Sequence, residues 1–166
     1  MNNNDIESTI KETIKSYEEQ KPFLEYFTKG VLTYFEKHLT LNSGSLPIIH
    51  SMKSRLKDST HLEGKIKRKF ERDGVVINSA NLFDEINDLA GIRILHLHQK
   101  QFIKIHEVIM DAIQKKHWYF PKNENPKAYT WDPEAKNFYK ELSIKCEIKE
   151  SYYTSIHYII MPQKKK

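Results

Sequence analysis

Hydrophobic positions recur every three or four residues in the N-terminal part of the chain. A first stripe consists of Ile6, Ile10, Ile14 and Tyr17. A second stripe consists of Phe23, Phe27, Val31 and Phe35. Both patterns are typical of amphipathic helices, and Pro22 between them is expected to end the first helix. We therefore predict helices over 4–20 and 23–38, followed by a loop over 40–47.

Further along, the pattern alternates between strand and helix periodicities. Runs typical of strands cover 48–55, 91–97, 142–148 and 155–161. Helical patterns cover 59–72, 81–87 and 101–116. The buried side of the last of these helices is predicted to consist of Phe102, Ile105, Val108, Ile109 and Ala112. This alternation predicts an α+β fold, in which a mixed sheet is flanked by helices.

The residues between these elements predict where one helix begins and ends and where a loop lies. Ser59 and Thr60 are candidate N-caps of the helix over 59–72, and Gly74 is the candidate residue that closes it. The segment over 121–137 is rich in Pro, Asn and aromatic residues. We expect it to form a long surface loop.

Composition and charge narrow the class of protein. The length of 166 residues suits one domain with a helical appendage, and a charged fraction of 30% argues against burial in a membrane. The N-terminus does not resemble a signal peptide, so we expect a cytoplasmic protein. The single cysteine, Cys146, excludes an internal disulfide and is expected to pack in a strand. A net charge of +5 is compatible with a polyanionic ligand such as a nucleotide or RNA.

One short segment combines charge with a predicted core strand. Asp88 precedes an apolar run, Leu-Ala-Gly-Ile-Arg-Ile-Leu, and Arg93 interrupts that run. Because charge is costly to bury unless it is paired or binds a metal or phosphate, the arrangement suits a functional site. An ordinary alternative fits the spacing as well: Asp88 ends the preceding segment, and Arg93 pairs with a neighbouring carboxylate.

Basic residues gather where the first predicted strand leads into the next helix. The cluster consists of Arg55, Lys57, Lys65, Lys67, Arg68 and Lys69. A helix N-terminus also attracts anions through its free N–H groups and its dipole. We expect the strand, turn and helix to direct Arg55, Lys57 and Lys65 toward one point. Lys67 and Lys69 suit a solvated face of the helix.

The order of these motifs resembles a known family. A strand with Arg55 and Lys57 leads into a cationic helix, Asp-Leu-Ala-Gly-Ile-Arg follows at 88–93, and Ser-Tyr-Tyr-Thr-Ser-Ile-His follows at 151–157. From about His50 to Met161 this resembles the RelA/SpoT-type alarmone synthetase domain. The resemblance implies a nucleotidyltransferase-like synthetase domain over 46–166, after an N-terminal helical segment over 1–45. It also implies transfer of pyrophosphate from ATP to the 3′-hydroxyl of GDP or GTP.

The resemblance also implies roles for individual residues. Asp88 matches the aspartate that binds Mg²⁺, the expected cofactor. Arg55 and Arg93 match arginines that stack on the adenine of ATP, and Lys57 and Lys65 match cations that hold its phosphates. These side chains and the ring of Tyr153 are all expected to line a single phosphate-sized cleft.

On the acceptor side, Tyr153 matches the tyrosine on which the acceptor guanine stacks, and His157 lies beside the acceptor phosphates. Without the resemblance, Tyr153 suits cross-strand packing and His157 suits a hydrogen-bonded core histidine. His61 stands where the family usually has a small hydroxyl residue.

Some features depart from the family pattern and leave alternatives open. Tyr152 replaces the usual Gly before the substrate tyrosine, and the family's Glu-x-Gln-x-Arg-Thr strand, with the expected general base, would follow Lys166. We therefore expect residues 1–166 to bind nucleotides with little turnover. One alternative acceptor is the 3′ end of tRNA, as in some relatives. Another alternative is a non-catalytic, basic RNA-binding module, and the N-terminal stripes also suit a homo-oligomer face.

Overall fold

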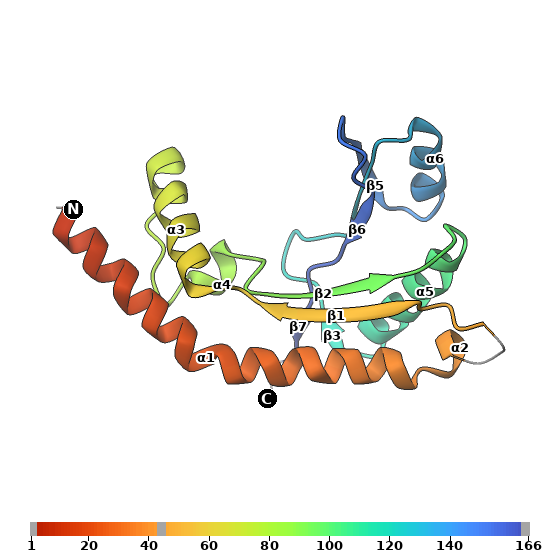
Figure 1. The fold of residues 1–166 in the computed structure, drawn as a ribbon, viewed down its shortest axis with the longest axis horizontal. Coiled ribbons are helices and arrows are strands. Elements are labelled where there is room, and N and C mark those ends of the chain that lie inside the picture. Colours follow the sequence, from red (N-terminus) through yellow and green to blue (C-terminus); the bar gives the residue numbers. More distant parts are fainter. Residues whose placement is uncertain (1–2, 43–45, 164–166) are drawn as a thin grey trace. The chain divides into compact units, whose positions relative to one another are not determined.

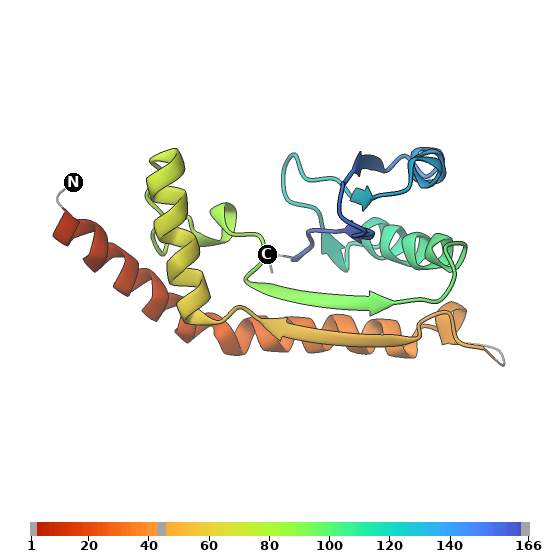
Figure 2. The ribbon, with the colours of Figure 1, turned by 45° about the horizontal axis from the view of Figure 1, so that its top comes forward.

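The computed structural model of the chain describes residues 3–42 and 46–163. Its residues fall into two compact units, Met1–Leu97 and His98–Lys166. Helices and small sheets occur together, which confirms the predicted α+β class (Figures 1 and 2). The division into a helical segment over 1–45 and a synthetase domain over 46–166 stays a prediction. None of the described helices is long and apolar enough to span a bilayer.

The first unit holds four helices and one two-stranded sheet within its described residues. In chain order these elements are α1 (Asn3–Lys37), α2 (Leu39–Asn42), β1 (Ser51–Leu56), α3 (Ser59–Asp73), α4 (Leu82–Glu85) and β2 (Ala90–Leu95). Part of the loop predicted over 40–47 is therefore the end of α2, while residues 43–45 lie outside the described residues. The strands predicted over 48–55 and 91–97 are confirmed with shorter bounds.

Helix α1 continues through Pro22, so the predicted break at this residue is wrong. The apolar residues that it buries keep a seven-residue spacing across the proline and include Ile10, Tyr17, Leu24 and Val31. Because Tyr17 before the proline and Leu24 after it belong to one core cluster, packing across this point outweighs the backbone hydrogen bond that proline removes. Figure 1 shows that α1 changes direction along its length, as proline-containing helices do. Phe23, assigned to the buried stripe, is 55% exposed.

The sheet of the first unit has one apolar and one cationic face. Strands β1 and β2 are antiparallel, with register from Ser51↔Leu95 to Leu56↔Ala90. Leu56 and Ala90 pack against the core cluster that contains Tyr17 and Leu24 of α1. Since alternate residues of a strand point to opposite faces, Arg55 and Arg93 lie on the face that points away from this core.

The second unit combines two helices with two sheets. Its elements are α5 (Gln101–Gln114), β3 (Trp118–Tyr119), β4 (Lys127–Thr130), α6 (Pro133–Glu141), β5 (Lys145–Ile148), β6 (Ser155–His157) and β7 (Met161–Pro162). One sheet is mixed and has the order β5-β4-β6, with β4 and β5 parallel; the other pairs β3 with β7. The five positions predicted to be buried on α5 are all buried. Cys146 lies in β5 and packs against the core of this unit, as predicted.

Two predictions are wrong, one about a loop of the second unit and one about the number of sheets. The segment over 121–137 is not one long loop, because it contains β4 and the start of α6. Asp132 caps α6 by accepting a hydrogen bond from Glu134 N at 2.9 Å, and Pro133 occupies its first turn. The described strands also form three small sheets, instead of the single mixed sheet that we predicted.

Candidate functional site

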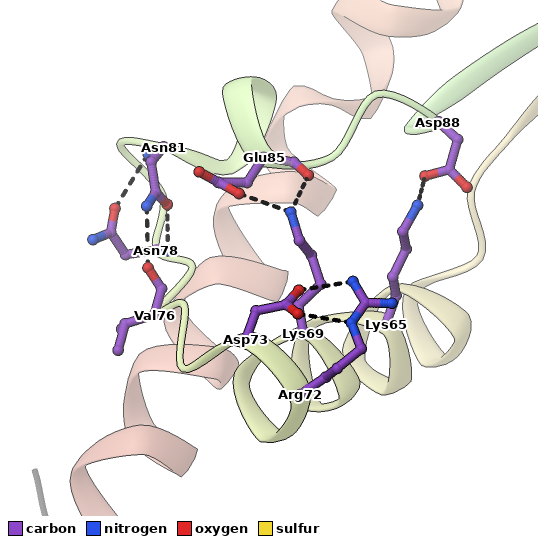
Figure 3. A network of polar contacts seen from close by, with 9 residues as sticks. All are labelled: Lys65, Lys69, Arg72, Asp73, Val76, Asn78, Asn81, Glu85 and Asp88. Atoms are coloured by element: carbon purple, nitrogen blue, oxygen red, sulfur yellow. Dashed lines mark hydrogen bonds and ion pairs between the residues drawn. The ribbon is translucent and has the colours of Figure 1, made fainter.

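A charge centre forms where the start of β2 meets the turn between β1 and α3. Lys57 Nζ lies 2.8 Å from Asp88 Oδ2, and Lys65 Nζ lies 2.7 Å from Asp88 Oδ1. The side chains of Asp88, Lys65 and Lys57 are 45%, 33% and 14% exposed. Figure 3 shows Lys65 reaching from α3 to Asp88. The structure thus directs Lys57 and Lys65 to one point, the Asp88 carboxylate. The same prediction for Arg55 is wrong, because within the described residues Arg55 makes no contact with this carboxylate and lies opposite Gly91 on the outer face of the sheet.

Electrostatics keep this centre ionised. Burial by itself would raise the pKa of the Asp88 carboxyl, but its hydrogen bonds to Lys57 and Lys65 hold that pKa below its ordinary value. One carboxylate faces two ammonium groups, so the centre carries an excess positive charge. A ligand with more than one negative charge would complete the neutralisation.

Tyr17 of α1 holds the backbone on both sides of the charge centre. Its buried hydroxyl donates to Lys57 O at 2.6 Å and to Leu89 O at 3.2 Å. Lys57 N in turn donates to Leu89 O at 2.8 Å. Burial raises the pKa of Tyr17 to about 12, so the hydroxyl stays a donor. The residue before Leu89 is Asp88, and Tyr17 therefore positions both strand ends that carry the centre.

A second contact joins α1 to the first turn of α3. Glu18 accepts hydrogen bonds from Lys21 Nζ, at 2.6 Å, and from the Ser59 hydroxyl. Ser59 is therefore not the N-cap. Asp58 takes that role, because its backbone is extended and its side chain accepts from His61 N at 3.1 Å. The His61 side chain is exposed on the same turn, while Gly74 closes the helix with φ +69° as predicted.

The outer face of the β1–β2 sheet carries cations that have no carboxylate beside them. Cross-strand register places Arg55 opposite Gly91 and Lys53 opposite Arg93, all on one face. None of the three cations forms an ion pair within the described residues, so the ordinary alternative, in which Arg93 pairs with a carboxylate, is wrong. Like charges directly opposite each other destabilise a sheet, which argues for an anionic or aromatic ligand on this face.

The spacing on this face suits a flat ring. Arg55 and Arg93 are diagonal neighbours across the two strands, a relation that separates side chains by about 7–8 Å. A planar ring between two guanidinium groups needs about twice the carbon contact distance of 3.5–4.0 Å, which is the same separation. Gly91 adds no side chain here, and Arg55 Cγ and Nε lie 3.9 Å from where its Cβ would be.

Helix α3 adds an open groove of about 590 Å³ to the charge centre. The residues that line it are Lys65, Arg68, Lys69, Glu71, Arg72, Glu85 and Asn87. Lys69 is bound to Glu85, 2.7 Å from Oε2 and 3.0 Å from the backbone O, and Arg72 pairs with Asp73 (Figure 3). Lys67 lies on the solvated face and pairs with Glu63 at 2.7 Å, as expected. The same prediction for Lys69 is wrong, because its side chain is 22% exposed and bound to Glu85. Three of the four cations in the groove are paired with carboxylates, and Arg68 is the one without an ion pair within the described residues.

The acceptor residues predicted in the second unit form a network of their own. Tyr153 Oη and Ser155 Oγ each lie 3.0 Å from His157 Nε2. Tyr153 is 50% exposed, and its ring lies 6.3 Å from that of His157, edge to face. Burial lowers the pKa of His157, so this imidazole is neutral at pH 7. The Tyr153 side chain is therefore half-exposed, while its hydroxyl is held by the hydrogen bond with His157.

The structure brings the predicted residues together within each unit. Asp88, Lys57 and Lys65 are in contact, Arg55 and Arg93 share one face, and Tyr153 is bonded to His157. That Asp88, the four cations and Tyr153 line one cleft stays a prediction. Sequence reasoning missed Lys53, whose signal was the alternation Lys-x-Arg-x-Lys over 53–57. It also missed the role of Tyr17, which no local pattern could reveal.

Comparison with known proteins adds a family. A family model described as "Region found in RelA / SpoT proteins" matches residues 54–166, which is more than half of the chain. The match includes all seven predicted site residues, whereas Tyr17, Glu18 and Lys53 lie before it. Neither the curated proteins nor the solved structures gave a match.

Proposed function

Because the chain belongs to the RelA/SpoT family, we propose that it transfers pyrophosphate from ATP to the 3′-hydroxyl of GDP or GTP. The observation that carries the proposal is the charge centre, in which one carboxylate is held between Lys57 and Lys65 beside a face of unpaired arginines. Phosphoryl-group transfer depends mainly on positioning and on cations that neutralise developing charge. The centre offers both.

The first unit binds the donor nucleotide in this proposal. Arg55 and Arg93 stack on the two faces of adenine, a task for flat guanidinium groups. Lys57 and Lys65 hold phosphate oxygens, and the groove along α3 supplies Arg68 as a further cation. In the reaction, the acceptor hydroxyl loses its proton to water and its oxygen forms a bond to the β-phosphorus. The bond from that phosphorus to the bridging α-phosphate oxygen breaks, and AMP leaves.

The donor set also fits a magnesium ion carried by the nucleotide. Asp88 is a half-exposed carboxylate, and the described residues contain no group of three or more His, Cys, Asp or Glu able to hold a metal by themselves. Mg²⁺ is commonly bound by one or two carboxylates together with substrate phosphates and water. We therefore assign Asp88 as its protein ligand. When bound, the ion would neutralise phosphate charge.

The second unit binds the acceptor in this proposal. Tyr153 offers one open ring face to a guanine, and the Tyr153–His157 hydrogen bond fixes the angle of that ring. His157 lies next to this face and is neutral, so it acts toward the acceptor phosphates as a hydrogen-bonding group. Because burial lowers the pKa of His157, its imidazole becomes charged only in acidic solution.

Transfer of radiolabel from [β-³²P]ATP to GDP, GTP or tRNA tests the proposal. We expect slow transfer of label to a guanine nucleotide, in keeping with the little turnover expected of residues 1–166. We expect Asp88→Asn to lower this rate by about 10²-fold or more, since it removes the charge that organises Lys57 and Lys65. Asp84→Asn is the matched control, because Asp84 is an exposed carboxylate on α4.

Other outcomes would redirect the assignment. Label found in tRNA alone would identify the RNA 3′ end as the acceptor. RNA affinity that falls with salt and is indifferent to Asp88→Ala, with no label transfer and no magnesium-dependent binding of ATP, would show a basic RNA-binding module instead and refute the proposal.

A further inference from the structure

The chain leaves the three-stranded sheet directly after His157. Strand β6 has three residues and lies at one edge of the sheet, where it pairs with β4. Residues 158–160, which separate it from β7, belong to no strand. Because so short a ladder fixes the backbone weakly at its end, the position of His157 depends on what holds the next residue, Tyr158.

Tyr158 is anchored on helix α5. Its hydroxyl lies 2.7 Å from Nδ1 of His106, within hydrogen-bonding distance, and the centres of the two rings lie 6.1 Å apart. The Tyr158 ring packs against the core cluster that contains Phe102, and the Phe102 ring lies 5.8 Å from that of His106. Since a polar group buried without a partner is costly, this bond stabilises the place of both side chains. It joins α5 to the residue that follows His157.

Both groups of this bond are uncharged at neutral pH. Burial raises the pKa of the Tyr158 phenol above its ordinary value and lowers the pKa of the His106 imidazole. Replacing either residue by an apolar one therefore leaves no buried charge behind.

His157 itself lies with the residues predicted to bind the acceptor. Its Nε2 is 3.0 Å from Tyr153 Oη and 3.0 Å from Ser155 Oγ, whereas Ile156 and Tyr158 pack against the core. Neighbouring residues of an extended chain point to opposite sides. A rotation of the backbone at Tyr158 would therefore move the His157 imidazole away from Tyr153, and the anchor on α5 limits such a rotation.

We propose that His106 is a positioning residue of the acceptor site, because its hydrogen bond with Tyr158 holds the backbone at His157 and so keeps that imidazole beside Tyr153. That this site takes a guanine nucleotide rests on the proposed function. The hold of His106 on His157 does not depend on it.

Binding of GDP and of ATP, measured by isothermal titration, provides the first test. His106→Leu keeps an apolar side chain and loses the bond to Tyr158, and we expect it to weaken GDP binding about 3- to 10-fold. ATP binding should change by less than about 2-fold. His106→Asn can place an amide group where Nδ1 lies, and it should restore GDP binding to within about 2-fold of wild type.

Two further variants separate the bond from general damage to the fold. Tyr158→Phe removes the same bond from the other side, so the double variant with His106→Leu should bind GDP no more than about 2-fold more weakly than either single variant. Val108→Ala is the matched control, because Val108 is buried on α5 outside the cluster that packs on Tyr158. GDP affinity unchanged in His106→Leu, or lowered as much in Val108→Ala, would overturn the proposal.

Imidazole ¹H–¹⁵N correlation spectra without nucleotide test the hold on His157 directly. The His157 signals, identified by their loss in His157→Gln, should shift or broaden in His106→Leu and stay as in wild type in His106→Asn and Val108→Ala. Signals of His157 that do not respond to His106→Leu would overturn the proposal. No GDP binding by any form, with His157 signals that do respond, would refute the proposed function and support the hold of His106 on His157.

Discussion

The two units of the chain carry charge in different ways. Residues 1–97 contain 14 Lys and Arg against 14 Asp and Glu, whereas the remaining residues have 13 against 8. In the neutral unit, Lys57 and Lys65 both bind the Asp88 carboxylate. The buried hydroxyl of Tyr17 holds the backbone at Lys57. In the basic unit, the large rings of Trp131, Tyr152 and Tyr153 are exposed. Fixed charges suit phosphates that must be placed accurately, and rings suit bases that vary in position.

Removing both arginines of the sheet face should break this comparison most strongly. We expect the double substitution Arg55→Ala and Arg93→Ala to weaken ATP binding about 100-fold, since each stacked guanidinium contributes on the order of 1–2 kcal/mol. Isothermal titration with ATP and with GTP measures the effect. Lys67→Ala is the control, because Lys67 lies on the solvated face of α3 and pairs with Glu63. An equal loss for GTP would show that the face does not distinguish donor from acceptor.

Two substitutions of Tyr153 should distinguish the role of its ring from that of its hydroxyl. We expect Tyr153→Ala to weaken binding of the acceptor about 10-fold, because a stacking partner is lost. Tyr153→Phe keeps the ring, loses only the bond to His157, and should change affinity by less than about 3-fold. Fluorescence titration with a labelled guanine nucleotide provides the measurement. Equal losses in the two variants would assign the role to the hydroxyl instead.

Tyr17 should test whether the fixed charges depend on α1. Tyr17→Phe removes the donor to Lys57 O and Leu89 O, and we expect it to lower the free energy of unfolding by about 1–2 kcal/mol. Urea denaturation measures this loss. Tyr26→Phe, on an exposed position of the same helix, should be neutral. No loss in Tyr17→Phe would mean that the carbonyl groups have other partners in solution.

Acid should reveal the smallest of these effects. The pKa of Asp88 is lower in the folded chain than in the unfolded one, so its ion pairs stabilise the fold above about pH 4 and cease to do so as the pH falls through the folded-state value. We expect wild type to exceed Asp88→Asn by less than about 1 kcal/mol at pH 7, since the carboxylate is 45% exposed. Urea midpoints of the two should converge below pH 4. A gap that persists at pH 3 would contradict this origin.

Elements that depend on local pattern could be predicted from the sequence. The α5 stripe and the Gly74 closure are examples, because period and backbone freedom decide them within a few residues. Pro22 and the segment over 121–137 could not be predicted in this way. At Pro22 the outcome depends on a core that is built by distant residues, and in 127–130 the alternation is only four residues long.

The candidate site, like the fold, could be predicted only where residues close together in sequence decide it. The cations at 55, 57 and 65 were evident because they stand close together in sequence. That Lys57 and Lys65 share the Asp88 carboxylate was predicted neither by the residue pattern nor by the family resemblance. The alignment of Lys53 with Arg93 depends on strand register, and the contact of Tyr17 with Leu89 joins residues far apart in the chain. Neither relation is written in a local motif.

The hydroxyl of Tyr17 also makes α1 a mechanical part of the charge centre. The family match begins at residue 54, yet this one side chain connects α1 to the backbone next to both Lys57 and Asp88. A shift of the helix along its axis would therefore pull on both sides of the centre at once. A partner that binds α1 would therefore change the spacing of these charges without contacting the nucleotide.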